Sequence, residues 1–300
     1  MIIKLADHYG LCFGVRDAIA EATRLAQQGP LTILGELVHN PIVRERLARA
    51  GVREGSLQEP AETGQVLITA HGASDIARGA WREAGHGVSD ATCPLVRHAH
   101  QQLQMLVAVG FAPVVIGKHG HVEVNGLIGD FPQAFVVQTE ADIERLPEEA
   151  KLGVVSQTTQ PIDTVLELVA AIRIARPRCE VRFVDTVCQP TKNRQLALRK
   201  LIAECDTLVV VGGHNSNNTL QLVAAGLAAG LVVYHIERPD ELRDDWFTDL
   251  NVVGLTAGTS TLKETVAEVH AALVRIGEQC VGGDASRTEA PLPRTDENAA

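Results

Sequence analysis

The feature that most constrains the fold of this chain is a threefold repeat of cysteines and glycines. Cys12, Cys93 and Cys188 are 81 and 95 residues apart, and each stands between an apolar run and a stretch of helical pattern. A second marker is a glycine after an apolar run, with a polar residue four positions later. It occurs three times, and successive glycines are 82 and 95 residues apart. The marker pairs are Gly35 with His39, Gly117 with His121 and Gly212 with Ser216. Two markers in one register predict three similar units around a pseudo-threefold axis.

Each unit is predicted to be an α/β unit. Short apolar runs alternate with segments of helical periodicity, which is typical of parallel sheets connected by right-handed crossovers. We expect a first unit over residues 1–92, a second over 93–187 and a third over 188–280, followed by a disordered tail over 281–300. Because such folds bind ligands at the carboxyl ends of their strands, the three units should surround one central cavity that could hold a cluster.

Composition excludes several classes of protein. The 300 residues carry a net charge of −10, which argues against nucleic acid as the main partner. The sequence has no apolar run of the length that a membrane helix needs, and its first residues lack the pattern of a signal peptide. Six cysteines are too few for a disulfide scaffold. We therefore expect a cytoplasmic protein.

Three cysteines from three units could bind a metal. Zinc with three cysteines and one histidine is one possibility, and an iron–sulfur cluster is another. A cluster held by three cysteines leaves one iron without a protein thiolate, and that iron can act as a Lewis acid toward a substrate oxygen. Cys93 and Cys188 stand near predicted helix starts, which favours a lowered thiol pKa. We expect no site at Cys179, Cys205 and Cys280.

A further group of polar side chains follows the predicted strands. Imidazoles, hydroxyls, an amide and helix starts together favour a site for phosphate or diphosphate. The sequence has no P-loop or dinucleotide-binding glycine motif, so ATP and NAD are not indicated. Taken singly, these residues could equally be helix caps and turn residues. They are His39, His71, His121, Ser216, Asn218 and Ser260.

Glu123 is the candidate acid of the predicted cavity. It follows His121 by two residues in a stretch rich in glycine and histidine. A carboxyl group beside a cluster could relay protons. The alternative is an exposed glutamate in a first helical turn, favoured there by the helix dipole. Thr158 could be a hydroxyl relay or a simple cap.

Several short stretches between Gly10 and Ser260 stand in an order that is typical of one known family. They are Gly10–Val15, Val38–Asn40, Ala70–Gly72, Asp90–Val96, His119–Val124, Ser156–Thr159, Cys188 with Asn193–Gln195, Asn215–Asn218 and Thr256–Ser260. Together they resemble the LytB (IspH) family of 4-hydroxy-3-methylbut-2-enyl diphosphate reductases. The chain departs from the usual pattern at Val122, Asn217, Thr261 and Gln189-Pro190, but none of these changes removes a cysteine or Glu123.

The resemblance implies an iron–sulfur oxidoreductase at the last step of the methylerythritol phosphate route to isoprenoids. It implies one 4Fe–4S cluster on Cys12, Cys93 and Cys188. The reaction would convert (E)-4-hydroxy-3-methylbut-2-enyl diphosphate to isopentenyl and dimethylallyl diphosphates, with single electrons from ferredoxin or flavodoxin. Glu123 would deliver protons, helped by Thr158 and His121. The implied diphosphate ligands are His39, His71, His121, Ser216, Asn217, Asn218 and Ser260, with Thr158 also near the substrate.

Two other functions fit the residues. A non-redox 4Fe–4S dehydratase of the quinolinate-synthase kind would turn over without external electrons, and a zinc or anion-binding module would contain no iron. One surface hypothesis concerns basic residues near Cys188, which could dock an acidic electron carrier or form an ordinary solvated helix face. They are Lys192, Arg194, Arg199 and Lys200.

Overall fold

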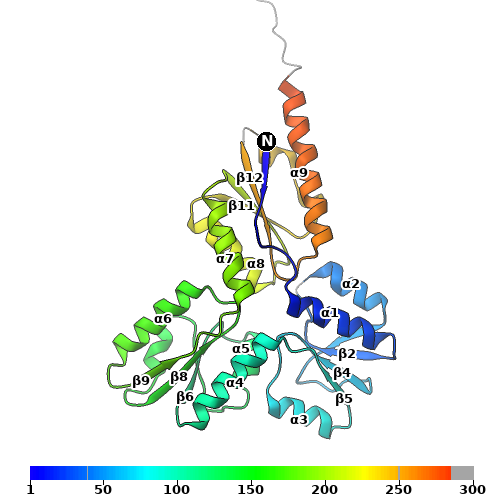
Figure 1. Ribbon diagram of the computed structural model, residues 1–300. Helices are drawn as coiled ribbons and strands as arrows, with labels where there is room; N and C mark the ends of the chain where they lie inside the picture. The colour runs from blue at the N-terminus through cyan, green and yellow to red at the C-terminus, as the bar shows by residue number, and fades with distance from the viewer. Residues whose placement is uncertain (39, 249–250, 285–300) are drawn as a thin grey trace, which may run out of the picture.

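The computed structural model describes residues 1–38, 40–248 and 251–284, with side chains up to Gln279. The chain forms three lobes around a common centre (Figure 1). Each lobe contains a four-stranded parallel sheet flanked by helices, as the sequence predicts. Among the described residues, no helix is both long and apolar enough to cross a membrane.

The first lobe has the strand order β3-β2-β4-β5. Its strands are β2 (Leu31–Leu34), β3 (Val52–Gly55), β4 (Gln65–Ile68) and β5 (Gly87–Asp90), and its helices are α1 (Phe13–Ala26), α2 (Pro41–Arg49) and α3 (Asp75–Glu83). Leu31 and Ile33 of the central strand pack with Ala18 and Ala22 of α1 in one buried cluster. Strand β3 is absent from the sequence prediction.

The second lobe repeats this order as β7-β6-β8-β9. Its strands are β6 (Ala112–Ile116), β7 (Phe135–Val137), β8 (Lys151–Ser156) and β9 (Glu180–Phe183), and its helices are α4 (Pro94–Ala108), α5 (Val122–Ile128), the 3-10 helix η1 (Glu140–Arg145) and α6 (Ile162–Ala175). The short helix α5 begins inside the stretch rich in glycine and histidine, and Glu123 lies in its first turn.

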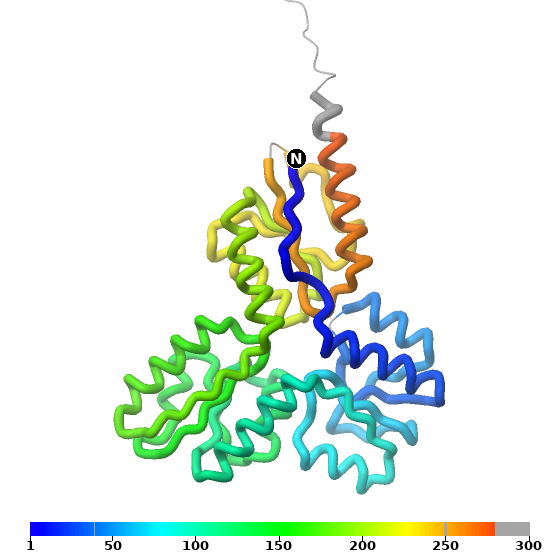
Figure 2. Tube along the Cα trace, viewed as in Figure 1, coloured from blue at the N-terminus to red at the C-terminus, as the bar shows by residue number. Residues whose placement is uncertain are grey.

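The third lobe has the order β11-β10-β12-β1, so its last strand comes from the start of the chain. Its strands are β10 (Thr207–Val211), β11 (Val232–Ile236), β12 (Val252–Ala257) and β1 (Ile2–Leu5), and its helices are α7 (Gln189–Ile202), α8 (Asn217–Ala228), η2 (Pro239–Glu241), η3 (Asp244–Phe247) and α9 (Lys263–Asp284). Strand β1 pairs in parallel with β12. Figure 2 shows the first residues running beside the last helix in this lobe.

The pairing of β1 changes one predicted boundary. The expected first unit, residues 1–92, does not share one sheet, because Ile2–Leu5 completes the sheet of the third lobe. With this correction each cysteine follows the fourth strand of a sheet, namely β1, β5 or β9. Helix α9 continues to Asp284, past the point where the tail was expected to begin, and residues 285–300 of that tail lie outside the described residues.

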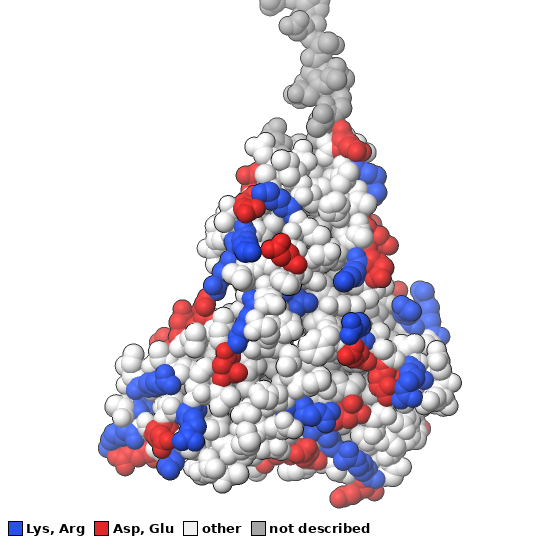
Figure 3. All heavy atoms as spheres, viewed as in Figure 1, with Lys and Arg blue, Asp and Glu red and all other residues white. Residues whose placement is uncertain are grey.

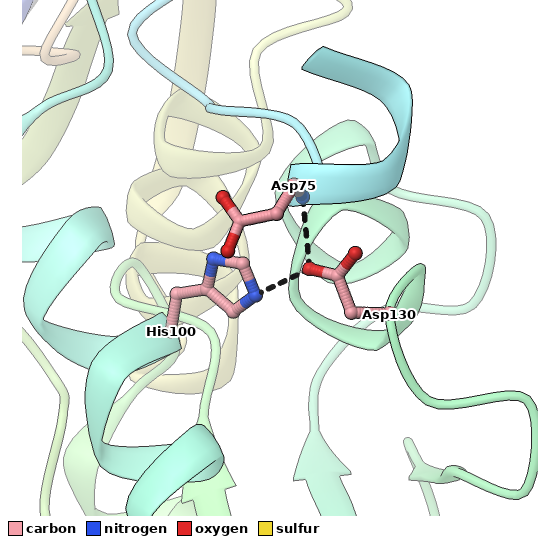
Figure 4. A group of neighbouring side chains, drawn as sticks. All are labelled: Asp75, His100 and Asp130. Carbon is pink, nitrogen blue, oxygen red and sulfur yellow. Dashed lines mark hydrogen bonds and ion pairs between the residues drawn. The ribbon is translucent and has the colours of Figure 1, made fainter. Parts of the chain in front are cut away.

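A hydrogen-bonded group joins the first two lobes (Figure 4). Asp130, which follows α5, accepts hydrogen bonds of 2.9 Å from the backbone N–H groups of Asp75 and Ile76 at the start of α3. His100 of α4 lies 2.9 Å from the same carboxylate. A negative charge at a helix N-terminus is favourable. One lobe therefore supplies a cap to a helix of its neighbour.

Candidate active site at the junction of the lobes

The three cysteines occupy equivalent positions in the three lobes. Cys12, Cys93 and Cys188 are the N-cap residues of α1, α4 and α7. The backbone N–H of each cysteine donates a hydrogen bond to a carbonyl oxygen two residues past the end of β12, β4 or β8. These bonds are Cys12 to Thr259 at 3.2 Å, Cys93 to Ala70 at 3.0 Å and Cys188 to Thr158 at 2.9 Å. The same backbone bond thus holds each cysteine in place.

The cysteines line one cavity of about 80 Å³ together with Glu123 and Thr158. Helix α1 packs so tightly against the second lobe here that a Cβ atom on Gly14 would lie 2.5 Å from Sγ of Cys93. Thiolates are soft ligands that suit zinc, copper(I) and iron–sulfur groups. Three thiol donors on three helix starts therefore fit a metal or an iron–sulfur group at this position.

The expected lowering of the thiol pKa at Cys93 and Cys188 is wrong. Burial raises the pKa of Cys93, and hydrogen bonds from the backbone of Leu95 and Val96 offset this only in part. Burial also raises the pKa of Cys188, whose Sγ lies 3.0 Å from Oγ1 of Thr191. Loss of hydration disfavours a thiolate more than the helix start favours it.

Glu123 is a buried acid rather than an exposed helix-start residue. The residue is only 1% exposed, and its Oε1 accepts a hydrogen bond of 2.6 Å from the backbone N–H of Thr158. Burial raises the pKa of Glu123 to about 7, although hydrogen bonds from Thr158 oppose this shift. His121 is the N-cap of α5, and its Nδ1 accepts the backbone N–H of Glu123 at 3.1 Å. A carboxyl group with this pKa can give up a proton near neutral pH.

A second cavity adjoins the first and contains most of the predicted anion ligands. His71, Thr159 and Thr259 line both cavities. The rings of His71 and His121 meet edge to face, with their centroids 5.7 Å apart. The predicted residues that line the second cavity are His71, His121, Ser216, Asn217, Asn218 and Ser260. The prediction for His39 falls on a residue outside the described part of the chain.

Several of these residues also have the capping roles that the sequence left open. Ser216 caps α8 by accepting the backbone N–H of Thr219, and Oδ1 of Asn218 accepts the N–H of Thr259 at 3.0 Å. Asn40 caps α2 and donates from Nδ2 to the carbonyl oxygen of Ser260 at 2.7 Å, which ties the first lobe to the third. Ser216 and His121 therefore combine helix capping with cavity lining.

Three polar cavity residues, Thr159, Thr191 and Thr259, were missed in the sequence. Thr159 and Thr259 belong to the loops after β8 and β12, next to the predicted residues Thr158 and Ser260. Thr191 lies in the first turn of α7, and its Oγ1 is 3.0 Å from Sγ of Cys188. The internal repeat contains a signal that could have identified Thr159. Thr159, His71 and Ser260 each stand three residues past the end of an equivalent strand.

The proposed basic docking patch near Cys188 does not exist as a set. Arg194 is buried. The other three basic residues form ion pairs, Lys192 with Asp185 at 2.6 Å, Lys200 with Asp7 at 3.5 Å and Arg199 with Asp163. Positive and negative side chains are interspersed over the face in Figure 3.

The fold and the site define a class: a three-lobed α/β protein with a three-cysteine centre, a buried acid and an adjoining polar pocket. The family model described as LytB protein matches residues 3–274. The chain therefore belongs to the LytB family, as the sequence motifs predict.

Similar proteins agree with this assignment. The 4-hydroxy-3-methylbut-2-enyl diphosphate reductase of Aquifex aeolicus is 35% identical over 286 residues, which cover 93% of this chain and 97% of the relative. The enzyme of the same name from Citrifermentans bemidjiense is 38% identical over 272 residues, covering 90% of this chain and 95% of the relative.

Solved structures extend the similarity to the fold. The E-1-hydroxy-2-methyl-but-2-enyl-4-diphosphate reductase from Plasmodium falciparum has a TM-score of 0.85 at 28% identity, covering 91% of this chain and 88% of that one. A structure of (E)-4-hydroxy-3-methyl-but-2-enyl diphosphate reductase, described as the terminal enzyme of the non-mevalonate pathway, has a TM-score of 0.67 at 33% identity, covering 92% of this chain and all of that one. The family is one of oxidoreductases, which favours a reductase over the non-redox dehydratase.

Proposed function

We propose that this protein converts (E)-4-hydroxy-3-methylbut-2-enyl diphosphate to isopentenyl and dimethylallyl diphosphates. The reaction consumes two electrons and two protons and releases the C4 hydroxyl as water. It requires one 4Fe–4S cluster, held by Cys12, Cys93 and Cys188. The predicted cytoplasmic location belongs to the same proposal.

One observation carries the proposal: the three cysteines and the buried Glu123 line a single cavity. A cluster bound there would supply single-electron transfer and, at the iron without a cysteine, a Lewis acid for the substrate hydroxyl. Glu123 holds a proton near neutral pH and gives it to the reacting end of the substrate. The neighbouring Thr158 fixes the carboxyl group through its backbone N–H.

The second cavity binds the other end of the substrate. The imidazoles of His71 and His121 offer hydrogen-bond donors to a diphosphate, as do the side chains of Ser216, Asn218 and Ser260. Asn217 and His39, of which His39 lies outside the described residues, complete the predicted ligand set. Because the two cavities adjoin, a short diphosphate substrate can place its phosphates in one and its hydroxyl in the other.

The electrons would come from a small one-electron carrier, ferredoxin or flavodoxin. The basic residues of α7 do not support a strongly charged docking patch, because each exposed one is paired with an acid. The carrier is therefore expected to bind with a weak dependence on salt.

The test is an anaerobic assay of the reconstituted protein with reduced methyl viologen, followed by mass spectrometry of the diphosphates. The expected result is loss of the hydroxylated substrate and formation of both products, with no turnover when the viologen is omitted. A fully loaded protein that leaves the substrate unchanged would contradict the proposal. Turnover without the reductant would instead indicate a dehydratase.

A further inference from the structure

A buried arginine lies directly behind the three-cysteine site. Arg194 is in α7, six residues after Cys188, and the residue is only 6% exposed. Burying a charged group is unfavourable unless other groups compensate for its lost hydration. An arginine is also protonated at every relevant pH, so it cannot escape this penalty by losing its charge. The groups around Arg194 must therefore compensate for the hydration that its charge loses on burial.

Its hydrogen bonds connect the two cysteine loops. Nη1 donates to the carbonyl oxygen of Pro190 at 3.0 Å, just after Cys188. Nη2 donates to the carbonyl oxygen of Gly10 at 2.5 Å, two residues before Cys12. Gly10 has a φ of +69°, a left-handed conformation that suits glycine. The planar guanidinium thus holds the turn that leads into Cys12. A lysine has a single ammonium nitrogen and cannot reproduce this planar pair of donors, referred to below as the guanidinium fork.

These carbonyl groups do not balance its charge. Within the described ranges, no carboxylate forms an ion pair with Arg194, and its buried Nε has no hydrogen-bond partner. The guanidinium is instead hydrogen-bonded to the loops that contain Cys12 and Cys188, and those two thiols become anionic when they bind a metal. A buried cation beside two of the site cysteines is matched in charge when those cysteines are thiolates in a bound cluster.

We propose that Arg194 is the fixed counter-charge of the three-cysteine site, and that it raises the reduction potential of the cluster bound there. This inference rests on the proposed function, because it presumes the cluster. Addition of one electron from an external carrier makes the site more negative by one charge. A fixed positive charge in a medium of low dielectric constant stabilises that reduced state more than the oxidised state. Arg194 is thus a positioning residue that touches no substrate.

The test is a redox titration of the reconstituted protein, followed by visible and electron paramagnetic resonance spectra, with iron content measured on each sample. Arg194→Met removes the charge at similar volume, and Arg194→Lys keeps a charge but loses the fork. Arg16→Met is the matched control. Arg16 follows Cys12 by four residues in α1, but it is exposed and paired with Asp17.

The expected result is a more negative midpoint potential for Arg194→Met, a smaller shift for Arg194→Lys and the wild-type value for Arg16→Met. Wild-type potentials in both Arg194 variants would overturn the inference. If Arg194→Met folds but binds no iron, retention of iron and a near-wild-type potential by Arg194→Lys would support it. Loss of iron from both folded variants would show that the fork matters and the charge does not. A wild-type protein without an iron–sulfur spectrum would instead contradict the proposed function.

Discussion

The backbone of Thr158 connects Glu123 to Cys188. Its N–H donates a hydrogen bond of 2.6 Å to Oε1 of Glu123, and its carbonyl oxygen accepts one of 2.9 Å from the N–H of Cys188. The acid is therefore held against a cysteine of the site through main-chain groups, which have fewer conformations than side chains. This connection is present although Val122, beside Glu123, is one of the departures from the family pattern.

The first prediction concerns the proton at Glu123. Glu123→Gln keeps the shape of the side chain but removes its acidic proton, so kcat should fall by about 10²- to 10⁴-fold. Iron content and KM should change little, because Gln can still accept the Thr158 bond. Steady-state kinetics with reduced methyl viologen measure this effect, and the exposed Glu140→Gln is the control. Unchanged kcat in Glu123→Gln would show that another group delivers the proton.

The raised pKa of Glu123 also predicts a pH dependence of stability. A carboxyl group with a folded pKa of about 7 and a reference value of 4.5 binds more protons in the folded state between these pH values. The free energy of unfolding of the cluster-free protein should therefore fall by about 2–3 kcal/mol from pH 5 to pH 8 on account of this group.

Urea unfolding of the wild type and Glu123→Gln at both pH values measures this contribution. The stability of the variant relative to the wild type should rise from pH 5 to pH 8, because glutamine has no charge to bury. A constant difference between the two proteins would mean that Glu123 does not titrate in this range.

The equivalence of the three cysteines predicts the same result for three substitutions. Serine at position 12, 93 or 188 should each reduce the bound iron strongly, because a hydroxyl is a poor substitute for a thiolate ligand. Cys179→Ser and Cys205→Ser are controls, since neither cysteine lines the cavity. Iron and sulfide assays after anaerobic reconstitution give the answer. Full iron content in any one of the three site variants would remove that cysteine from the ligand set.

The close approach of α1 to Cys93 predicts a specific effect of one methyl group. Gly14→Ala places a Cβ 2.5 Å from Sγ of Cys93, so that thiol must move and bound iron should fall. Gly79→Ala in α3 is the control, because nothing lies within 4 Å of its Cβ, and it should stabilise the protein by up to about 1 kcal/mol. Equal iron content in Gly14→Ala and the wild type would mean that the lobes can separate at this contact.

The lobe junction at Asp130 predicts a loss of stability without a loss of chemistry. Asp130→Ala removes the cap on α3 and should lower the free energy of unfolding by about 1–2 kcal/mol. Urea denaturation measures this change, and Asp244→Ala, an exposed aspartate of η3, is the control. A wild-type midpoint in Asp130→Ala would show that solvent replaces the cap.

The sequence predicts the site well where the signal repeats. Cysteines at one spacing and glycines at the same spacing identify equivalent loops, and the ends of parallel strands bring such loops together. The partner of β1 is not predictable in this way, since Ile2–Leu5 pairs with a strand about 250 residues away and leaves no local signal. Strand β3 was missed because Val52 is its only apolar residue.

Burial explains the remaining errors. Arg194 reads as a surface residue because charged side chains are mostly exposed, and its burial depends on contact with Gly10 in a distant part of the chain. The thiol pKa of Cys93 was expected to follow its helix start, but the depth of the cavity has the larger effect. The sequence allows Glu123 to be either a cavity acid or an exposed helix-start residue, because it does not show whether the side chain is buried.

The most direct test of the central claim measures metal content and turnover on one anaerobic sample. The expected result is about four iron and four sulfide per chain, with substrate consumed only when an electron donor is present. Zinc in place of iron, or full iron loading with turnover that needs no electron donor, would contradict it.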